Sequence, residues 1–350
     1  MPAWTVMAAS PTPRPRPAEP GLAPLPHGEP SGAPAAGADA LELALNAWAP
    51  SPPLAVACSG GADSMALLHA CAARWTGQVM AIHVHHGLQA AADDFARHVQ
   101  AACSALGVRL ECVHVDARHA SGESPEDAAR RARYLGLADA AQRIGAREVL
   151  LAQHADDQAE TLLIALSRGA GLPGLAAMPA RFERNGVAFG RPLLGVRSAA
   201  LRAWLAARRI GWIDDPTNAD AAYTRNRIRA QVLPALQAAL PGFVAMASRS
   251  AGHAAQAQGL LDELAQLDLQ ACGQPPAIAA LQALSAARQA NAIRAWLRDA
   301  HGTVPSTAQM DELLAQVAAC RTRGHRIEIK AGSGSVQRAG ERLQFCPGSR

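Results

Sequence analysis

Residues 59–64 read Ser-Gly-Gly-Ala-Asp-Ser and join an apolar run, Leu54 to Cys58, to a helical pattern over residues 65–75. This succession predicts a buried strand, a glycine loop and a helix. Two adjacent glycines let backbone N–H groups approach an anion without interference from a Cβ atom, and the start of the helix adds positive charge. The loop therefore predicts a site for a phosphate chain. Its predicted binding residues are Ser59, Gly60, Gly61, Ala62, Asp63 and Ser64.

The loop is not a Walker A motif, because the pattern GxxxxGK[ST] is absent. An acidic residue inside a phosphate loop suits a magnesium ion or a cationic substrate, so we expect Asp63 to be the metal ligand. The alternative is an ordinary glycine-rich turn in which Asp63 caps the helix. The two glycines alone do not separate these interpretations.

Apolar runs and helical patterns alternate along the following part of the chain. The runs at 78–86, 110–117 and 148–155 are each followed by a helical pattern, as the first run is. Continuous apolar strands that alternate with helices are typical of a parallel sheet with helices on both faces. The sequence therefore predicts an α/β fold with a Rossmann-like doubly wound sheet. Such sheets bind ligands at the carboxyl ends of their strands.

The remaining segments differ in composition. Residues 1–40 hold ten of the 24 prolines and little aliphatic periodicity, so we expect a disordered tail rich in proline and alanine. Residues 41–235 are the expected catalytic domain. Residues 241–350 are the expected C-terminal domain for substrate and tRNA binding, mostly helical, with a hairpin around a Gly-Ser turn at the end.

The whole composition describes an ordinary globular protein, with 49% hydrophobic and 18% charged residues. No stretch approaches the ~18 uninterrupted apolar residues of a membrane span, and the first residues lack the pattern of a secretory signal. We therefore expect a cytoplasmic protein without a membrane partner. The seven cysteines include no CxxC pair, which argues against a disulfide framework, a zinc site or an iron-sulfur site.

Positive charge is concentrated in one segment. Of the 33 basic residues only Lys330 is a lysine, a bias that genome base composition can produce by itself. Residues 196–229 contain seven arginines against three aspartates, a local balance of +4 that equals the net charge of the whole chain. This segment is where we expect a polyanion to meet the protein.

The glycine loop and six further ordered motifs between about Leu54 and Pro234 resemble those of one family. The loop at residues 59–64 is similar to the SGGxDS loop of the N-type ATP pyrophosphatase superfamily. Further motifs narrow the resemblance to the tRNA(Ile)-lysidine synthetase family. They are HVHHGL at 83–88, EDAARRARY at 126–134, HADDQAET at 154–161, RG with GL at 168–175, RPLL at 191–194, and DPTN with YTRNRIR at 215–229.

The resemblance implies a ligase that uses ATP, Mg²⁺ and free L-lysine. Members of the family adenylate O2 of the wobble cytidine in the CAU anticodon of tRNA(Ile), and the side-chain amine of lysine then attacks C2. The products are lysidine, AMP and pyrophosphate, and the tRNA then decodes AUA instead of AUG. The resemblance also implies the shorter form of the family, without an additional terminal domain.

Carried over residue by residue, the resemblance implies an acidic catalytic set of Asp63, Asp157 and Glu160. Such carboxylates would hold the lysine ammonium, which is not a nucleophile until it loses a proton. Asp157 and Glu160 lie one helical turn apart and share a face. Their alternative is a capping box at the start of a helix.

The resemblance implies that the catalytic residue Arg130 lies near the α-phosphate of ATP, where its charge would stabilise the transition state. We expect Arg225, Arg227 and Arg229 to contact tRNA phosphates. The alternative for all four arginines is a solvated helix face.

Histidines give a weaker signal. The family pattern leads us to expect a histidine where Gln153 stands, and His154 follows it. On a strand, this shift by one residue would point His154 to the opposite face, away from ATP. His83 and His85 share one face of a strand, but no third zinc ligand is nearby in the sequence.

Two other functions were weighed. A tRNA thiolase with the same loop would need a catalytic thiol or CxxC cluster ligands, and neither stands where expected. A non-catalytic nucleotide sensor or RNA-binding protein would not need Asp63, Arg130, Asp157 and Glu160 together. A homodimer is compatible with the sequence.

Overall fold

The computed structural model describes residues 38–85, 92–115, 125–215, 220, 222–322 and 324–348. The chain divides into two units at Ala35 and Ala36, and the first unit lies outside the described residues. The predicted tail 1–40 therefore lies outside them too, except for its last three residues. These begin a helix, α1 (Ala38–Ala47), so the folded part starts slightly before the predicted boundary.

A six-stranded sheet in the order β3-β2-β1-β4-β6-β5 forms the centre of the first part of the chain. All neighbours pair in parallel except β5 and β6, which form an antiparallel hairpin. The predicted α/β class and parallel sheet are confirmed. The hairpin was not predicted. The strands are β1 (Leu54–Ala57), β2 (Val79–His85), β3 (Arg109–His114), β4 (Glu148–Leu150), β5 (Arg181–Arg184) and β6 (Val187–Gly190).

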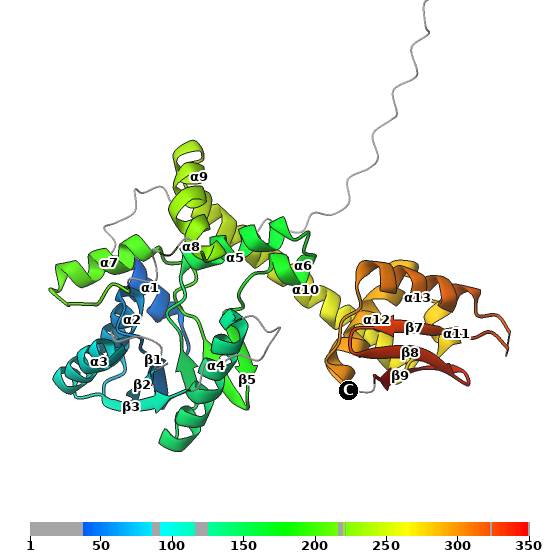
Figure 1. Ribbon diagram of the computed structural model, residues 1–350, viewed down its shortest axis with the longest axis horizontal. Helices are drawn as coiled ribbons and strands as arrows, with labels where there is room; N and C mark the ends of the chain where they lie inside the picture. The colour runs from blue at the N-terminus through cyan, green and yellow to red at the C-terminus, as the bar shows by residue number, and fades with distance from the viewer. Residues whose placement is uncertain are drawn as a thin grey trace, which may run out of the picture. The chain divides into compact units, whose positions relative to one another are not determined.

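Helices connect the parallel strands and cover both faces of the sheet (Figure 1). The helical pattern that follows the run at 110–117 forms a helix over Pro125–Ile144. The helices of this part are α2 (Ala62–Arg74), α3 (Ala92–Leu106), α4 (Pro125–Ile144), α5 (Ala155–Ser167), α6 (Leu172–Leu175), α7 (Ser198–Ala207), α8 (Thr224–Arg227) and α9 (Leu233–Ala239). A π-helical segment, η2 (Ile228–Val232), joins α8 to α9.

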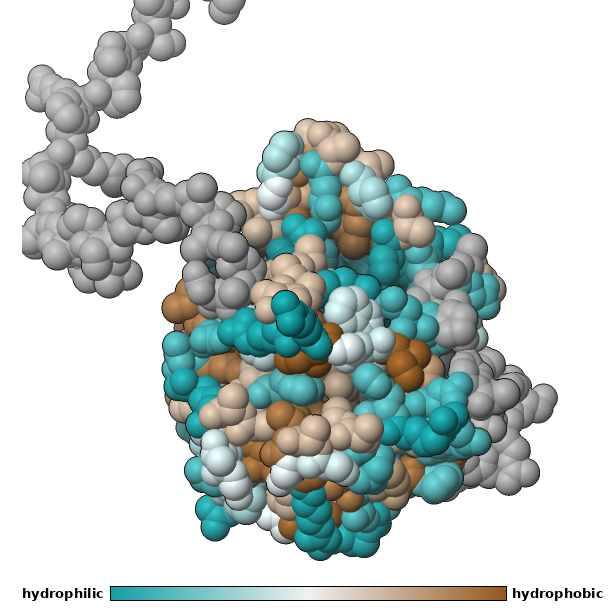
Figure 2. Space-filling model, turned by 90° about the vertical axis from the view of Figure 1, so that its left-hand side faces the viewer, coloured by the Kyte–Doolittle hydropathy of each residue, from teal (hydrophilic) through white to brown (hydrophobic). Residues whose placement is uncertain are grey.

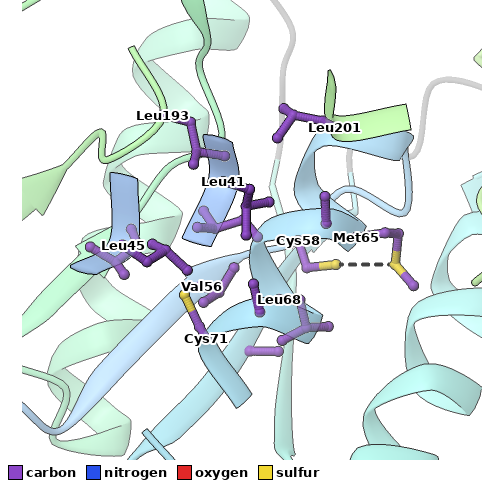
Figure 3. Packing of buried hydrophobic residues seen from close by; sticks show 14 of the residues in the cluster. Leu41, Leu45, Val56, Cys58, Met65, Leu68, Cys71, Leu193 and Leu201 are labelled. Carbon is purple, nitrogen blue, oxygen red and sulfur yellow. Dashed lines mark hydrogen bonds between the residues drawn. The ribbon is translucent and has the colours of Figure 1, made fainter. Parts of the chain in front are cut away.

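The side chains of β1 alternate between two cores, as the period of a strand requires. Leu54 and Val56 belong to a cluster that includes residues of α1, α2 and α7, whereas Ala55 belongs to a second cluster with α4. Figure 3 shows the first cluster, in which Leu41 and Leu68 are fully buried. Burying a leucine side chain contributes about 2 kcal/mol, so this core fixes β1 and α2 on either side of the glycine loop.

The last part of the chain combines helices with a small antiparallel sheet in the order β7-β8-β9. The predicted hairpin is β7 and β8, and the structure adds a third strand after it. Ser306 and Gln309 form a capping box at the start of one of these helices. The elements are α10 (Phe243–Cys272), α11 (Ile278–Gln282), α12 (Ala286–His301), α13 (Thr307–Ala319), β7 (Glu328–Ala331), β8 (Gly334–Ala339) and β9 (Arg342–Pro347).

Figure 2 shows one face of the described chain, on which hydrophobic residues lie in small separate patches among hydrophilic ones. Among the described residues, no single helix is long and apolar enough to cross a membrane. The helical stretches 224–239 and 243–272, which are bent by 98° relative to each other, meet the length and composition conditions only as a pair.

Candidate active site

The glycine loop between β1 and α2 is held by hydrogen bonds within the chain. Gly60 has φ +93°, a conformation that favours glycine, and a Cβ atom there would lie 3.1 Å from the Phe95 ring. The Ser64 hydroxyl accepts the backbone N–H groups of Ser59 at 3.1 Å and Gly60 at 3.2 Å. It also donates to the Gly61 carbonyl at 3.0 Å. The Ser64 hydroxyl therefore holds the backbone of residues 59–61 in the loop conformation.

The loop opens into a cavity of about 840 Å³ at the carboxyl ends of the strands. β1 lies between β2 and β4, where the strand order reverses, which is the expected ligand position in such a sheet. Of the predicted site residues, those that line the cavity are Ser59, Gly61, Ala62, Asp63, Ser64, Asp157 and Arg229. Further polar residues that line it are His83, His85, Arg133, Gln153, His154, Asp156, Arg197, Ser198, Arg202, Asp214, Asp215 and Gln237.

His154 lies at the centre of the acidic residues. It is the residue that precedes the first turn of α5, and its side chain is only 5% exposed. Its Nε2 atom lies 3.4 Å from an oxygen of Asp63 and 3.4 Å from an oxygen of Asp157, and its Nδ1 atom lies 3.6 Å from Asp156. Burial disfavours the charged imidazole, but the three carboxylates outweigh it and raise the pKa of His154.

The expected orientation of His154 is therefore wrong. β4 ends at Leu150, so the alternation of a strand does not extend to this residue. Gln153 lines the same cavity, and its side-chain oxygen accepts a 2.9 Å hydrogen bond from buried Arg191. Both residues of the pair thus reach the cavity.

Asp63 is joined to a helix far along the chain. The Ser198 hydroxyl, at the start of α7, donates to Asp63 at 3.0 Å, and the Ser198 backbone N–H donates to Asp156 at 2.9 Å. Arg197 forms an ion pair with Asp156 at 2.9 Å. Burial opposes ionisation of Asp63, but His154 and Ser198 outweigh it and lower the pKa of Asp63. No spacing in the sequence indicates these contacts of α7.

Glu160 does not line the cavity, and its side chain is fully buried. Arg229 donates to it through Nε at 2.7 Å and through Nη2 at 3.1 Å. The same Nη2 atom lies 3.0 Å from Asp157. Arg225 approaches Glu160 at 3.8 Å and donates to Thr161 at 3.3 Å. Two of the three arginines predicted to contact tRNA thus pair with the acidic set.

The remaining predicted arginines, Arg227 and Arg130, do not pair with the acidic set in the contacts given for them. Arg227 donates to the Ala222 carbonyl at 3.0 Å and to the Thr224 hydroxyl at 2.9 Å, and it is exposed. Arg130 is exposed and its guanidinium lies 5.8 Å from the centre of the Tyr134 ring. Arg130 is not among the residues that line the cavity, whereas Arg133, one turn further along α4, is.

The histidines of β2 do not form a metal site with their neighbours. His83 is buried and its Nδ1 atom lies 2.9 Å from the Cys58 carbonyl oxygen. Within the described segments, no group of three or more histidine, cysteine, aspartate or glutamate side chains is placed to hold a metal ion. Residues 86–88 of the HVHHGL motif and residues 216–218 of the DPTN motif lie outside the described residues.

Cys58, the cysteine next to the loop, is a packing residue. It is 2% exposed, its Sγ atom lies 3.8 Å from the Met65 sulfur (Figure 3), and burial raises its pKa to about 11. A thiol with this pKa is almost fully protonated near neutral pH and is a poor nucleophile. The geometry therefore gives the thiolase interpretation no support.

The fold and the site together define a nucleotide-binding protein of the PP-loop class. Residues 38–236 match the PP-loop domain family, which implies the use of ATP. Residues 277–344 match the TilS substrate binding domain. The chain belongs to the tRNA(Ile)-lysidine synthase family, whose members are ligases.

Several relatives carry the name tRNA(Ile)-lysidine synthase. The chain is 62% identical over 310 residues to that of Polaromonas naphthalenivorans, with 89% of this chain and 94% of the relative covered. It is 44% identical to that of Bordetella pertussis, with 83% and 94% covered. It is also 44% identical to that of Burkholderia pseudomallei, with 83% of this chain and 61% of the relative covered.

A solved structure shares the fold at much lower sequence identity. The U34-tRNA thiolase NcsA from Methanococcus maripaludis, with its [4Fe-4S] cluster, superposes with a TM-score of 0.53 at 15% identity. The match covers 62% of this chain and 77% of that one. This likeness concerns the fold alone.

Proposed function

We propose that this chain joins free L-lysine to C2 of the wobble cytidine in tRNA(Ile) with a CAU anticodon. The product, lysidine, changes decoding from AUG to AUA. The observation that carries the proposal is the meeting of Asp63 and Asp157 around His154 in one cavity with the glycine loop. Family membership and the substrate-binding match at residues 277–344 support it.

The reaction needs two displacements. First, cytidine O2 attacks the α-phosphorus of ATP, the bond from that phosphorus to the bridging oxygen breaks, and pyrophosphate leaves. The loop residues 59–64 would bind the phosphates, and the backbone N–H groups at the start of α2 would donate to them, because those of Ser59 and Gly60 are bonded to the Ser64 hydroxyl. Second, the deprotonated side-chain amine of lysine attacks C2, the C2–O2 bond breaks, and AMP leaves with O2.

The acidic residues suit the cationic substrate. Asp63 and Asp157 line the cavity with carboxylates, and Asp63 remains 32% exposed. Carboxylates that are ionised in an enclosed cavity attract an ammonium group more strongly than they do in open water. We assign Asp63 and Asp157 to lysine binding directly, and Glu160 to the same set behind them.

Asp63 also fits a magnesium ion. Mg²⁺ in phosphoryl-transfer sites is commonly bound by one or two carboxylates together with substrate phosphates. A single partly exposed carboxylate beside a phosphate loop matches this donor set. Magnesium would neutralise charge on the phosphates, and Asp63 would hold it next to the loop.

The arginines and domains keep the roles proposed from the sequence. Arg130 would stabilise charge on the α-phosphate, and Arg225, Arg227 and Arg229 would contact tRNA. Residues 41–235 would be the catalytic domain and 241–350 the domain that binds substrate and tRNA, which the matches at 38–236 and 277–344 support. We place the protein in the cytoplasm, where its tRNA substrate is found. The homodimer stays a prediction that light scattering tests.

The direct test is incorporation of labelled lysine into a tRNA(Ile) transcript with a CAU anticodon, with and without ATP. Label should enter the CAU transcript only when ATP and Mg²⁺ are present. A matched transcript with a GAU anticodon, which has no wobble cytidine, should remain unlabelled. Equal labelling of both transcripts, or none of either, would contradict the proposed function.

A further inference from the structure

The cation that neutralises Glu160 comes from the protein itself. Arg229 makes two hydrogen bonds to Glu160, at 2.7 and 3.1 Å, and one to Asp157, at 3.0 Å. Glu160 is fully buried, and the second Asp157 oxygen accepts the His154 backbone N–H at 3.1 Å. The carboxylates of Glu160 and Asp157 are therefore both hydrogen-bonded to groups of the chain itself.

A substrate ammonium cannot pair with Glu160 unless it displaces Arg229. An ammonium group placed against Glu160 and Asp157 would meet the Arg229 guanidinium at close range, and like charges repel most strongly where water is excluded. Asp63 is the most accessible of the three, because 32% of its side chain is exposed, against 16% for Asp157 and none for Glu160. The deeper part of the acidic set is open to a substrate cation only when Arg229 has left.

We propose that Arg229 is an internal occupant of the lysine-ammonium site, and that tRNA opens this site by drawing the guanidinium onto a phosphate. The proposal rests on the proposed function. It makes Arg229 a positioning residue that controls the order in which substrates bind. Free lysine then binds weakly before tRNA and tightly after it.

Two features of Arg229 allow this exchange. Its side chain is 42% exposed, so a phosphate can reach the guanidinium without unfolding the segment. Arginine binds phosphate bidentately, as it binds the carboxylate here. Arg229 also lies in η2, a π-helical segment, and such irregular turns are frequent at functional positions.

The movement of Arg229 from the carboxylates to a tRNA phosphate couples the binding of lysine to the binding of tRNA, in both directions. If tRNA raises the affinity for lysine by some factor, lysine must raise the affinity for tRNA by the same factor. The enzyme would then commit lysine to the cavity only when a cytidine is there to receive it.

The experiment measures lysine binding by calorimetry without ATP, in the presence and absence of a CAU tRNA(Ile) transcript. The variants are Arg229→Gln, Arg229→Lys and Gln231→Ala, the last being an exposed residue of the same segment. We expect tRNA to tighten lysine binding to the unmodified chain at least tenfold. Arg229→Gln should bind lysine at least tenfold more tightly without tRNA. Gln231→Ala should match the unmodified chain. Arg229→Lys keeps an internal cation without the bidentate contact and should bind lysine more weakly than Arg229→Gln does.

The proposal is overturned if Arg229→Gln binds lysine no better than the unmodified chain in the absence of tRNA. Where Arg229→Gln does not fold, the unmodified chain decides: equal lysine affinity with and without tRNA overturns the proposal. A chain that makes lysidine yet shows no coupling refutes this inference alone. A chain that binds no lysine under any condition and makes no lysidine refutes the proposed function as well.

Discussion

The Nε2 atom of His154 lies 3.4 Å from the Asp63 carboxylate, although one residue precedes α5 and the other belongs to the first turn of α2. The contact joins the glycine loop to the start of α5. It also places a titratable cation beside the acidic residues that are proposed to hold lysine.

This contact makes the protonation of His154 measurable. The carboxylates raise its pKa above the ordinary value of 6.5. The contribution of charged His154 to the stability of the folded state is therefore complete below pH 6.5, and it is lost as the pH rises through the folded-state pKa. Asp63→Asn removes one carboxylate and should lower the pKa of His154, as followed by NMR of the imidazole. An unchanged pKa would show that Asp63 does not interact with His154 in solution.

Asp63→Asn should also abolish lysine transfer while the protein remains folded. The substitution preserves shape and removes the charge proposed to hold magnesium or lysine, which the labelled-lysine assay measures. The matched control is Cys58→Ala at the end of the adjoining strand, which should retain transfer at saturating ATP because the buried thiol packs against Met65 and is assigned no part in the chemistry. Full activity of Asp63→Asn would contradict the proposed role of Asp63. Complete loss of transfer in a folded Cys58→Ala protein would support the thiolase interpretation.

Arg227→Ala should weaken tRNA binding and reduce the slope of log affinity against log salt by about one unit, because one phosphate contact is lost. ATP affinity should not change. Filter binding at several salt concentrations measures the first effect and nucleotide titration the second. Loss of the chemical step alone would place Arg227 in the active site instead.

Arg130→Ala should slow adenylation by about 100-fold while tRNA still binds, if its charge acts in the transition state. Arg133→Ala is the informative companion, because Arg133 lines the cavity in the structure and Arg130 does not. Single-turnover release of pyrophosphate compares the two. A normal rate for Arg130→Ala with a slow rate for Arg133→Ala would assign the proposed role to Arg133 instead of Arg130.

Arg191→Met should destabilise the fold by about 3 kcal/mol, because it leaves several buried polar partners unsatisfied. Arg191 is 3% exposed and donates to Gln153 at 2.9 Å, to the Pro179 carbonyl at 2.8 Å and to the Tyr134 hydroxyl at 3.1 Å. Arg184→Ala, whose guanidinium packs over the same Tyr134 ring, should cost less than about 1 kcal/mol. Denaturant unfolding measures both changes, and equal costs would contradict the role of the buried hydrogen bonds.

Most of the parallel sheet was predictable because β1, β2 and β4 are largely buried apolar runs followed by helices. β3 was predicted from the run at 110–117, although its side chains are exposed or half-buried, and β6 was not predicted. The β5–β6 hairpin was missed because Arg181–Arg184 alternates between exposed and half-buried residues and has no continuous apolar run. The Asn185-Gly186 turn between β5 and β6 was the available signal, since both residues have positive φ. Edge strands are less apolar than central ones and are therefore harder to detect.

The motifs named many of the residues that line the cavity, but not how they are joined. Ser198 reaches Asp63 only because α7 packs on α2, and packing between distant helices leaves no local spacing in the sequence. The same holds for Arg229 and Glu160, which the motifs assigned to different substrates. Their ion pair depends on how the segment after α8 returns to α5.

The Ser64 hydroxyl has a consequence for the energetics of nucleotide binding. Its bonds to the amides of Ser59 and Gly60 are formed within the chain, so the loop acquires its shape when β1 and α2 fold. The conformational entropy of the loop is then lost during folding and not during binding. Nucleotide affinity and the stability of this strand–helix unit are thereby linked: a cavity made in the core beneath the loop would weaken ATP binding without altering any atom that contacts ATP.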